Sequence, residues 1–261
     1  NMNERRTGDH DHGDIGSFQL YYKGPLSIEQ GVYYGAAWGD KHWRNYATRT
    51  VAANGLLVYN PDETYVYGSN VAEANDGGQK MAGSKAGGYE IAELKEHMSD
   101  DNLRTVTEGT YIGPNEKTPA FSYIKGNLTN AYSSSKMQSY KRSMVFMDTF
   151  NKTYPGVLVV FDRVTSTKAF YEKTWLLQAV SEPEISGNKM TIKNSNEEYC
   201  NGKLVNTVLY PESVNVSKVG GIGVYVSDGQ EWPVTGGTPQ SSDAYNSGWR
   251  CEGKPTTAAK D

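Results

Sequence analysis

The segment KRSMVFMDTFNKTYPGVLVVFDRV, residues 141–164, contains two apolar runs separated by a polar stretch. Residues 141–147 and 156–164 are rich in β-branched, aromatic and other apolar side chains, which favours extended strands. The dipeptide Pro155-Gly156 lies between the runs and interrupts the apolar pattern. The segment therefore predicts an antiparallel hairpin.

Similar strand-like runs recur on both sides of this hairpin, at spacings of roughly 10 residues. They lie at 17–23, 55–60, 104–112, 120–125, 169–180, 189–194, 203–210 and 221–228. This spacing, with 28 glycines and 19 tyrosines among 261 residues, favours stacked antiparallel sheets over a helical bundle. We therefore expect an all-β chain, with a large antiparallel β-sandwich at residues 1–180 and a smaller β-domain at residues 181–261. The turn-rich tail from residue 235 predicts no closing strand, so the second domain is expected to be truncated.

The stretch 70–103 departs from this pattern because it is rich in glycine and charged residues. It predicts an insertion loop that lies over the sheets. One short helix is expected in it, near residues 91–97.

Charge is distributed unevenly along the chain. The net charge of −4 gives no overall reason to expect a polyanion as partner, and no nucleic acid partner is expected. Residues 121–175 nevertheless contain eight Lys or Arg against three acids. The basic residues are Lys125, Lys136, Lys141, Arg142, Lys152, Arg163, Lys168 and Lys173. Such an excess could attract an acidic polymer, or it could belong to solvated strand faces.

The two cysteines, Cys200 and Cys251, are too few for a disulfide framework or a zinc–thiolate site. They could pair with each other in an exported protein. No apolar run reaches about 18 residues, so no membrane span is predicted.

The first thirty residues concentrate the side chains best suited to chemistry. In DHDHGDIGSFQLYYKGPLSIEQ, residues 9–30, two histidines precede Glu29. Histidine transfers protons or binds metals near neutral pH. In an extended segment His10 and His12 would project to the same face, and Glu29 could return across a hairpin as a further metal ligand. The alternative is a pair of surface histidines in a polar strand.

Several long blocks of the chain resemble the heparinase II/III family of polysaccharide lyases, in its heparinase II branch. They are HDHGDIGSFQLYYKGPLSIEQGVYYG at 10–35, HWRNYATRTVAANGLLVYNPDE at 42–63, FSYIKGNLTNAYSSSKMQSYKRSMVFM at 121–147, PGVLVVFDRV at 155–164 and KTWLLQAVSEPEI at 173–185. The resemblance implies a periplasmic or secreted bacterial enzyme with an N-terminal α/α-toroid, a central β-sandwich and a smaller C-terminal β-domain. This chain resembles the last two parts only, and its own toroid would be its partner.

The resemblance also implies β-elimination next to a uronate of heparin, heparan sulfate or a related acidic polysaccharide. The uronate carboxylate is neutralised, a base removes the C5 proton and an acid protonates the departing O4. The Tyr and His that do most of this lie on the toroid, and the sandwich contributes a cleft histidine that matches His10. Tyr33 matches a cleft-facing tyrosine that contacts sugar. Asp9 stands beside His10, where the family tends to carry a neutral Asn.

A zinc ion in the sandwich is a further implication of the resemblance. Its ligands match His12, Glu29 (an Asp in the family) and Ala53 (a His in the family, just before the position of Asn54). Alanine cannot bind zinc, so either another side chain substitutes or the metal is weakened or lost. The candidates for a substitute ligand are Asp14, Asp40 and His42.

Three functions are open at this point. The chain could be the sandwich half of a lyase active site, inactive without the toroid. It could be a non-catalytic carbohydrate-binding or structural module that uses the basic residues of 121–175 and exposed aromatic side chains. It could also be a homodimer platform for the toroid, without glycan contact. Arg49 and Asn45 could line a cleft, although strand salt bridges are the favoured interpretation.

Overall fold

The computed structural model describes residues 2, 12–32, 40–67, 70–80, 103–194, 200–234 and 246–258. The chain is mostly β, with 44% of its residues in strands and several antiparallel sheets. The prediction of an all-β fold is therefore confirmed.

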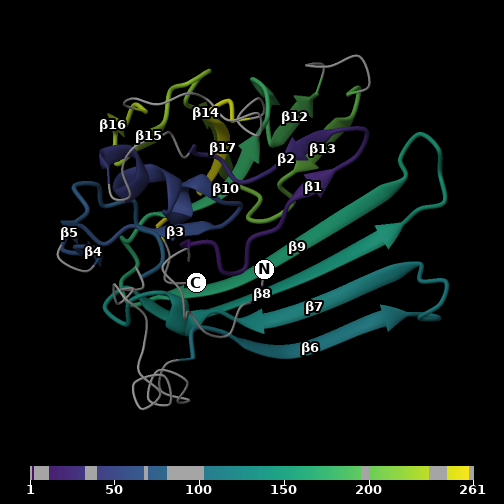
Figure 1. Ribbon diagram of the computed structural model, residues 1–261. Coiled ribbons are helices and arrows are strands. Elements are labelled where there is room, and N and C mark those ends of the chain that lie inside the picture. The colour runs from purple at the N-terminus through teal and green to yellow at the C-terminus, as the bar shows by residue number, and fades with distance from the viewer. Residues whose placement is uncertain are drawn as a thin grey trace, which may run out of the picture.

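The largest sheet consists of four long antiparallel strands in the order β6-β7-β8-β9. They are β6 (Val106–Gly113), β7 (Phe121–Asn127), β8 (Met137–Asp148) and β9 (Gly156–Ser166). Lys141 pairs with Arg163 and Met147 with Val157, so the predicted hairpin is confirmed. We call these four strands the long sheet. They form the lower layer in Figure 1, and their hairpin ends extend beyond the upper layer.

A second four-stranded sheet lies across from the long sheet. Its order is β14 (Val214–Val219), β17 (Trp249–Pro255), β10 (Lys173–Ala179) and β3 (Leu56–Val58). Leu56 and Val58 of β3 pack in one core with Met137 and Tyr140 of β8. The two sheets therefore form a sandwich whose inner faces share an apolar core.

The remaining elements are short. A third sheet contains β11 (Glu184–Ser186), β12 (Lys189–Lys193) and β13 (Lys203–Thr207). Two-stranded pairs are formed by β1 (Leu20–Tyr21) with β2 (Pro25–Ser27), β4 (Val66–Tyr67) with β5 (Asn70–Val71), and β15 (Val226–Ser227) with β16 (Gln230–Glu231). Short helical turns are η1 (Trp43–Ala47), η2 (Thr50–Ala52) and η4 (Thr129–Ala131). The predicted strands at 17–23 and 221–228 are thus much shorter than expected, and the predicted helix at 91–97 lies outside the described residues.

The tail contains a strand that the sequence did not predict. β17 hydrogen-bonds to β14 on one side and to β10 on the other, so it is a central strand. Its Arg250 and Glu252 are buried and form an ion pair of 2.7 Å, which explains why the segment lacks a strand-like apolar pattern. The expected boundary at residue 180 falls between strands of this single sheet.

Both cysteines, Cys200 and Cys251, are buried. Burial raises the pKa of the Cys251 thiol to about 12, which keeps it protonated. In the part of the chain that the structure describes, no helix has the length and apolar character to span a membrane.

Candidate functional site

The structure brings together His12 and Glu29, the two predicted zinc ligands that it describes. Nδ1 of His12 lies 2.5 Å from Oε1 of Glu29, a contact between residues 17 positions apart. The side chains are 19% and 24% exposed, so the pair lies at the protein surface but is partly shielded from water. This is the hydrogen-bonded arrangement in which a carboxylate orients an imidazole ring.

Backbone hydrogen bonds to one buried segment, residues 48–52, position both members of the pair. Gly13, next to His12, donates its N–H to the carbonyl of Thr48 at 2.8 Å. Gln30, next to Glu29, donates to the carbonyl of Ala52 at 2.8 Å. Two segments far apart in the sequence are thus held against one short stretch, and this brings the imidazole to the carboxylate.

The chain that follows His12 is held by buried side chains. Gln79 donates from Nε2 to the carbonyl of Ile15 at 2.7 Å, and its Oε1 accepts the N–H of the same residue at 3.2 Å. Arg142 of β8 donates from Nη1 to the carbonyl of Gly16 at 2.7 Å. Both of these side chains are almost completely buried. Segment 15–16 is therefore fixed from two directions.

We call Gln79, Arg142 and Asn54 the frame, and Asn54 is its third member. It is fully buried and donates from Nδ2 to the carbonyl of Phe18 at 2.6 Å. Its Oδ1 accepts the Oγ–H of Ser27 at 3.1 Å and the N–H of Gln178 at 2.7 Å. One amide thus joins the segments that carry His12 and Glu29 to strand β10. Because Asn54 is fully buried and its side chain joins three separate segments, it has a structural role.

Ala53 is fully buried and contributes no metal-binding atom. Its carbonyl accepts a hydrogen bond of 3.0 Å from Nε2 of Gln178. In a tetrahedral zinc site the bond lengths place neighbouring N and O ligands roughly 3.4 Å apart, whereas Nδ1 of His12 and Oε1 of Glu29 are 2.5 Å apart. Among the residues that the structure describes, no three His, Cys, Asp or Glu are grouped as metal ligands would be. This donor set does not fit a zinc ion, and we assign no chemical step to one.

The candidate substitute ligands His42 and Asp40 are engaged elsewhere. His42 is buried, donates from Nδ1 to the carbonyl of Trp232 at 2.7 Å and accepts the N–H of Val32 at Nε2 at 3.2 Å. Burial lowers the pKa of this imidazole, so the neutral ring is favoured. Oδ1 of Asp40 accepts the N–H of Trp43 at 2.7 Å.

We expect the purified protein to contain well below one zinc ion per chain. His12 and Glu29 bind each other, and Ala53 offers no side-chain ligand, so these residues do not provide a three-ligand site with high affinity for zinc. Elemental analysis after dialysis against metal-free buffer measures the content, and thermal unfolding with and without a chelator should give the same midpoint. The variant His12→Ala should show the same low content. One tightly held zinc per chain, lost in His12→Ala, would contradict this expectation.

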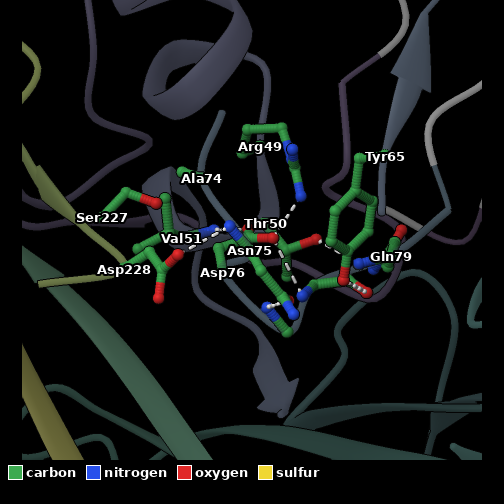
Figure 2. Close-up of polar contacts among 12 residues, drawn as sticks. Arg49, Thr50, Val51, Tyr65, Ala74, Asn75, Asp76, Gln79, Ser227 and Asp228 are labelled. Atoms are coloured by element: carbon green, nitrogen blue, oxygen red, sulfur yellow. Dashed lines mark hydrogen bonds and ion pairs between the residues drawn. The ribbon is translucent and has the colours of Figure 1, made fainter. Parts of the chain in front are cut away.

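A second buried network surrounds Arg49 and Asp76 (Figure 2). Both side chains are 1% exposed and form an ion pair. The Arg49 guanidinium also lies 3.8 Å from the centroid of the Tyr65 ring. Asp76 accepts the N–H of Gly78 at 3.0 Å and that of Val51 at 3.3 Å. Arg49 is therefore a structural residue, in agreement with the salt-bridge interpretation.

Asn45 has a similar structural role. Its Oδ1 accepts the N–H groups of Glu73 and Ala74 at 2.7 and 2.9 Å, and its Nδ2 donates to the carbonyl of Lys41 at 2.9 Å. The side chain is fully buried. It holds the loop around residue 73 and does not line a surface.

The basic residues of 121–175 are divided between the surface and the core. Lys136 and Arg142 are completely buried. Nζ of Lys136 lies 2.5 Å from a Glu63 carboxylate oxygen, and Nε of Arg142 lies 2.7 Å from Oδ1 of Asp162. The expected surface excess is therefore smaller than the sequence indicated, because these two cations are neutralised inside the fold.

Three predicted site residues, His10, Asp9 and Tyr33, lie outside the described residues, so their roles stay predictions. Gln79, Asp76 and Gln178 were not singled out by the sequence. Gln178 does carry a signal, since it interrupts the apolar run WLLQAV of residues 175–180. A polar side chain in the middle of a buried strand must find partners, which is what Gln178 does.

No protein-family model matches the sequence, and no curated protein is significantly similar to it.

Proposed function

We propose that this chain is the β-sandwich portion of a polysaccharide lyase that cleaves uronate-containing glycosaminoglycans, such as heparin or heparan sulfate, by β-elimination. The enzyme would act in the periplasm or outside the cell. A toroid domain would supply the main catalytic Tyr and His, and this chain alone would be inactive. The proposal rests on the resemblance of the motif blocks and on how the first of them is held.

One observation supports the proposal most directly: the motif segment is held rigidly. Gln79, Arg142 and Asn54 each hydrogen-bond the backbone within residues 15–18, and His12 meets Glu29 just before that stretch. Catalytic residues must be held within a fraction of an ångström by side chains that are themselves fixed. A polar surface strand without a role in a site needs no such frame.

The proposed chemistry breaks the C5–H and C4–O4 bonds of the substrate and forms a C4–C5 double bond. A base takes the C5 proton, and the departing O4 receives a proton. In this scheme His10 faces the sugar, Tyr33 and Asp9 contact it, and His12 with Glu29 positions the segment.

We expect this chain alone to bind heparin fragments of defined length and to release no unsaturated uronate, followed by the ultraviolet absorbance of the product. His10→Ala should weaken binding roughly tenfold, the loss expected for one charge-assisted hydrogen bond. Titration calorimetry measures the affinity, and circular dichroism checks that the fold is kept. A neutral glucan serves as the control ligand.

Three results would each contradict part of the proposal. Equal affinity for the neutral glucan and for heparin would argue against a uronate substrate. An affinity for heparin that is unchanged in His10→Ala would argue against a role for His10 in binding the glycan. Turnover by this chain alone would show that the toroid is not required.

A further inference from the structure

The outer face of the long sheet is exposed to solvent and has no role in the site described above. Side chains alternate between the two faces of a strand, and in β8 the inward residues Tyr140, Arg142 and Met144 are buried. The residues between them, such as Lys141, face outward. In β9 the outward residues Val157, Val159, Phe161 and Arg163 are all exposed.

A row of cations crosses this face. The strand register places Lys141 of β8 directly opposite Arg163 of β9, and Lys125 of β7 lies on the same face. Glu108 of β6 contacts Nζ of both lysines at 2.6 Å. Among the described residues, no acid forms an ion pair with Arg163. Like charges directly opposite each other destabilise a sheet, so three cations with one carboxylate are not explained by folding.

Aromatic rings lie next to the row on the same face. Phe161, two residues from Arg163, is 52% exposed, and Tyr111 of β6 is 53% exposed. Tyr123 pairs with Tyr111 across the sheet, and the ring centroids of Tyr111 and Phe121 are 5.6 Å apart. Sites for small ligands combine such aromatic and apolar surface with a few placed polar groups, and aromatic rings can stack on the C–H face of a sugar.

We propose that the outer face of the long sheet binds a stretch of acidic polysaccharide. Lys125, Lys141 and Arg163 would bind its carboxylate or sulfate groups, while Phe161 and Tyr111 would stack on its sugar rings. This surface is separate from the His12–Glu29 site, because Arg142 reaches the segment after His12 from the inward face. The choice of a glycan among polyanions rests on the proposed function.

Two other occupants fit the surface less well. In a two-fold contact between two copies of the chain, the cation row would face either the cation row of the second copy or its exposed apolar side chains. The first arrangement is costly because like charges repel, and the second because cations would be buried against apolar surface. Nucleic acids carry a dense row of phosphates and are bound through many cations at once. The chain offers few cations here and has a net charge of −4.

The test replaces two cations of the row and compares this with a matched control. The double variant Lys141→Glu/Arg163→Glu should bind heparin fragments at least roughly tenfold more weakly at physiological salt. The control Lys189→Glu/Lys203→Glu makes the same change in net charge at exposed positions of β12 and β13, and its affinity should stay within about twofold of the parent protein. A polyuronate without sulfate, used in parallel, distinguishes carboxylate from sulfate recognition.

A further variant tests the aromatic part. Phe161→Ser changes an exposed side chain, so the fold should be kept, and glycan affinity should fall. The proposal is overturned if the double variant and the control bind heparin equally. It is also overturned if single-stranded DNA or anionic vesicles bind in place of the glycan, or if light scattering shows a dimer that only the double variant loses. If His10→Ala weakens heparin binding and the double variant does not, only the proposal for the outer face is overturned. If the double variant weakens heparin binding and His10→Ala does not, only the cleft role of His10 is overturned.

Discussion

Replacing Arg142 by methionine should lower the free energy of unfolding by about 3–5 kcal/mol, the usual cost of breaking a buried ion pair from one side. Arg142 is completely buried and bonds Asp162 through two nitrogens, at 2.7 and 2.8 Å. Burial acts to lower the pKa of the guanidinium, but the charge of Asp162 outweighs burial and the pKa is raised. Methionine fills similar space and offers no donor, so the Asp162 carboxylate and the carbonyls of Gly16 and Asn54 would lose their bonds.

The neighbouring residue provides the matched control. Lys141→Met removes a cation from the outward face, where its ion pair with Glu108 is partly exposed, and it should change the unfolding free energy by less than about 1 kcal/mol. Urea denaturation monitored by circular dichroism measures both variants. Similar small losses for the two variants would mean that Arg142 does not hold the motif segment. The two residues are adjacent in the sequence and similar in charge, so the contrast isolates the effect of burial.

The long sheet could be predicted from the sequence because its strands carry their own signal. In KRSMVFM and GVLVVFDRV the apolar side chains are consecutive enough to favour strands, and Pro155-Gly156 marks the turn. In the structure the two runs pair as an antiparallel hairpin, with Lys141 opposite Arg163 and Met147 opposite Val157. What the sequence did not reveal is the direction of each side chain, and for this reason Arg142 and Lys141 were grouped in a single basic patch.

β17 and the frame could not be predicted for a related reason. Arg250 and Glu252 give WRCEGKP the appearance of an exposed segment, although the two charges satisfy each other in the centre of a sheet. The partners of Asn54 and Gln79 are likewise set by tertiary contacts, since Gln79 bonds a residue 64 positions away. The predicted zinc site placed His12 beside Glu29, and the structure brings the two side chains together, but they bond each other, and Ala53 offers no third side-chain ligand.

Replacing Asp76 by asparagine should also lower the free energy of unfolding by about 3–5 kcal/mol, although the two side chains have nearly the same shape. One carboxylate oxygen of Asp76 accepts from Arg49 and Gly78, and the other accepts from Val51. Whichever way the new amide is turned, its NH2 group would point at another donor. Arg49 would also remain buried beside Tyr65 and would lose its ion pair with Asp76.

Asp228→Asn is the control for this substitution, because Asp228 belongs to the same polar contacts but is exposed (Figure 2). Its Oδ2 accepts a single N–H, from Asn75 at 3.0 Å, and an amide oxygen can keep that bond. The change in unfolding free energy should therefore stay within about 0.5 kcal/mol, as for most surface substitutions. Chemical denaturation of both variants gives the comparison. A loss in Asp76→Asn no larger than that in Asp228→Asn would mean that the Arg49 ion pair does not stabilise the fold. A large loss of unfolding free energy in Asp76→Asn would instead show that the charge of Asp76, and not its shape, holds residues 49–51 against residues 76–79. Because Gln79 bonds both Thr50 and Ile15, the same charge would also support the segment that follows His12.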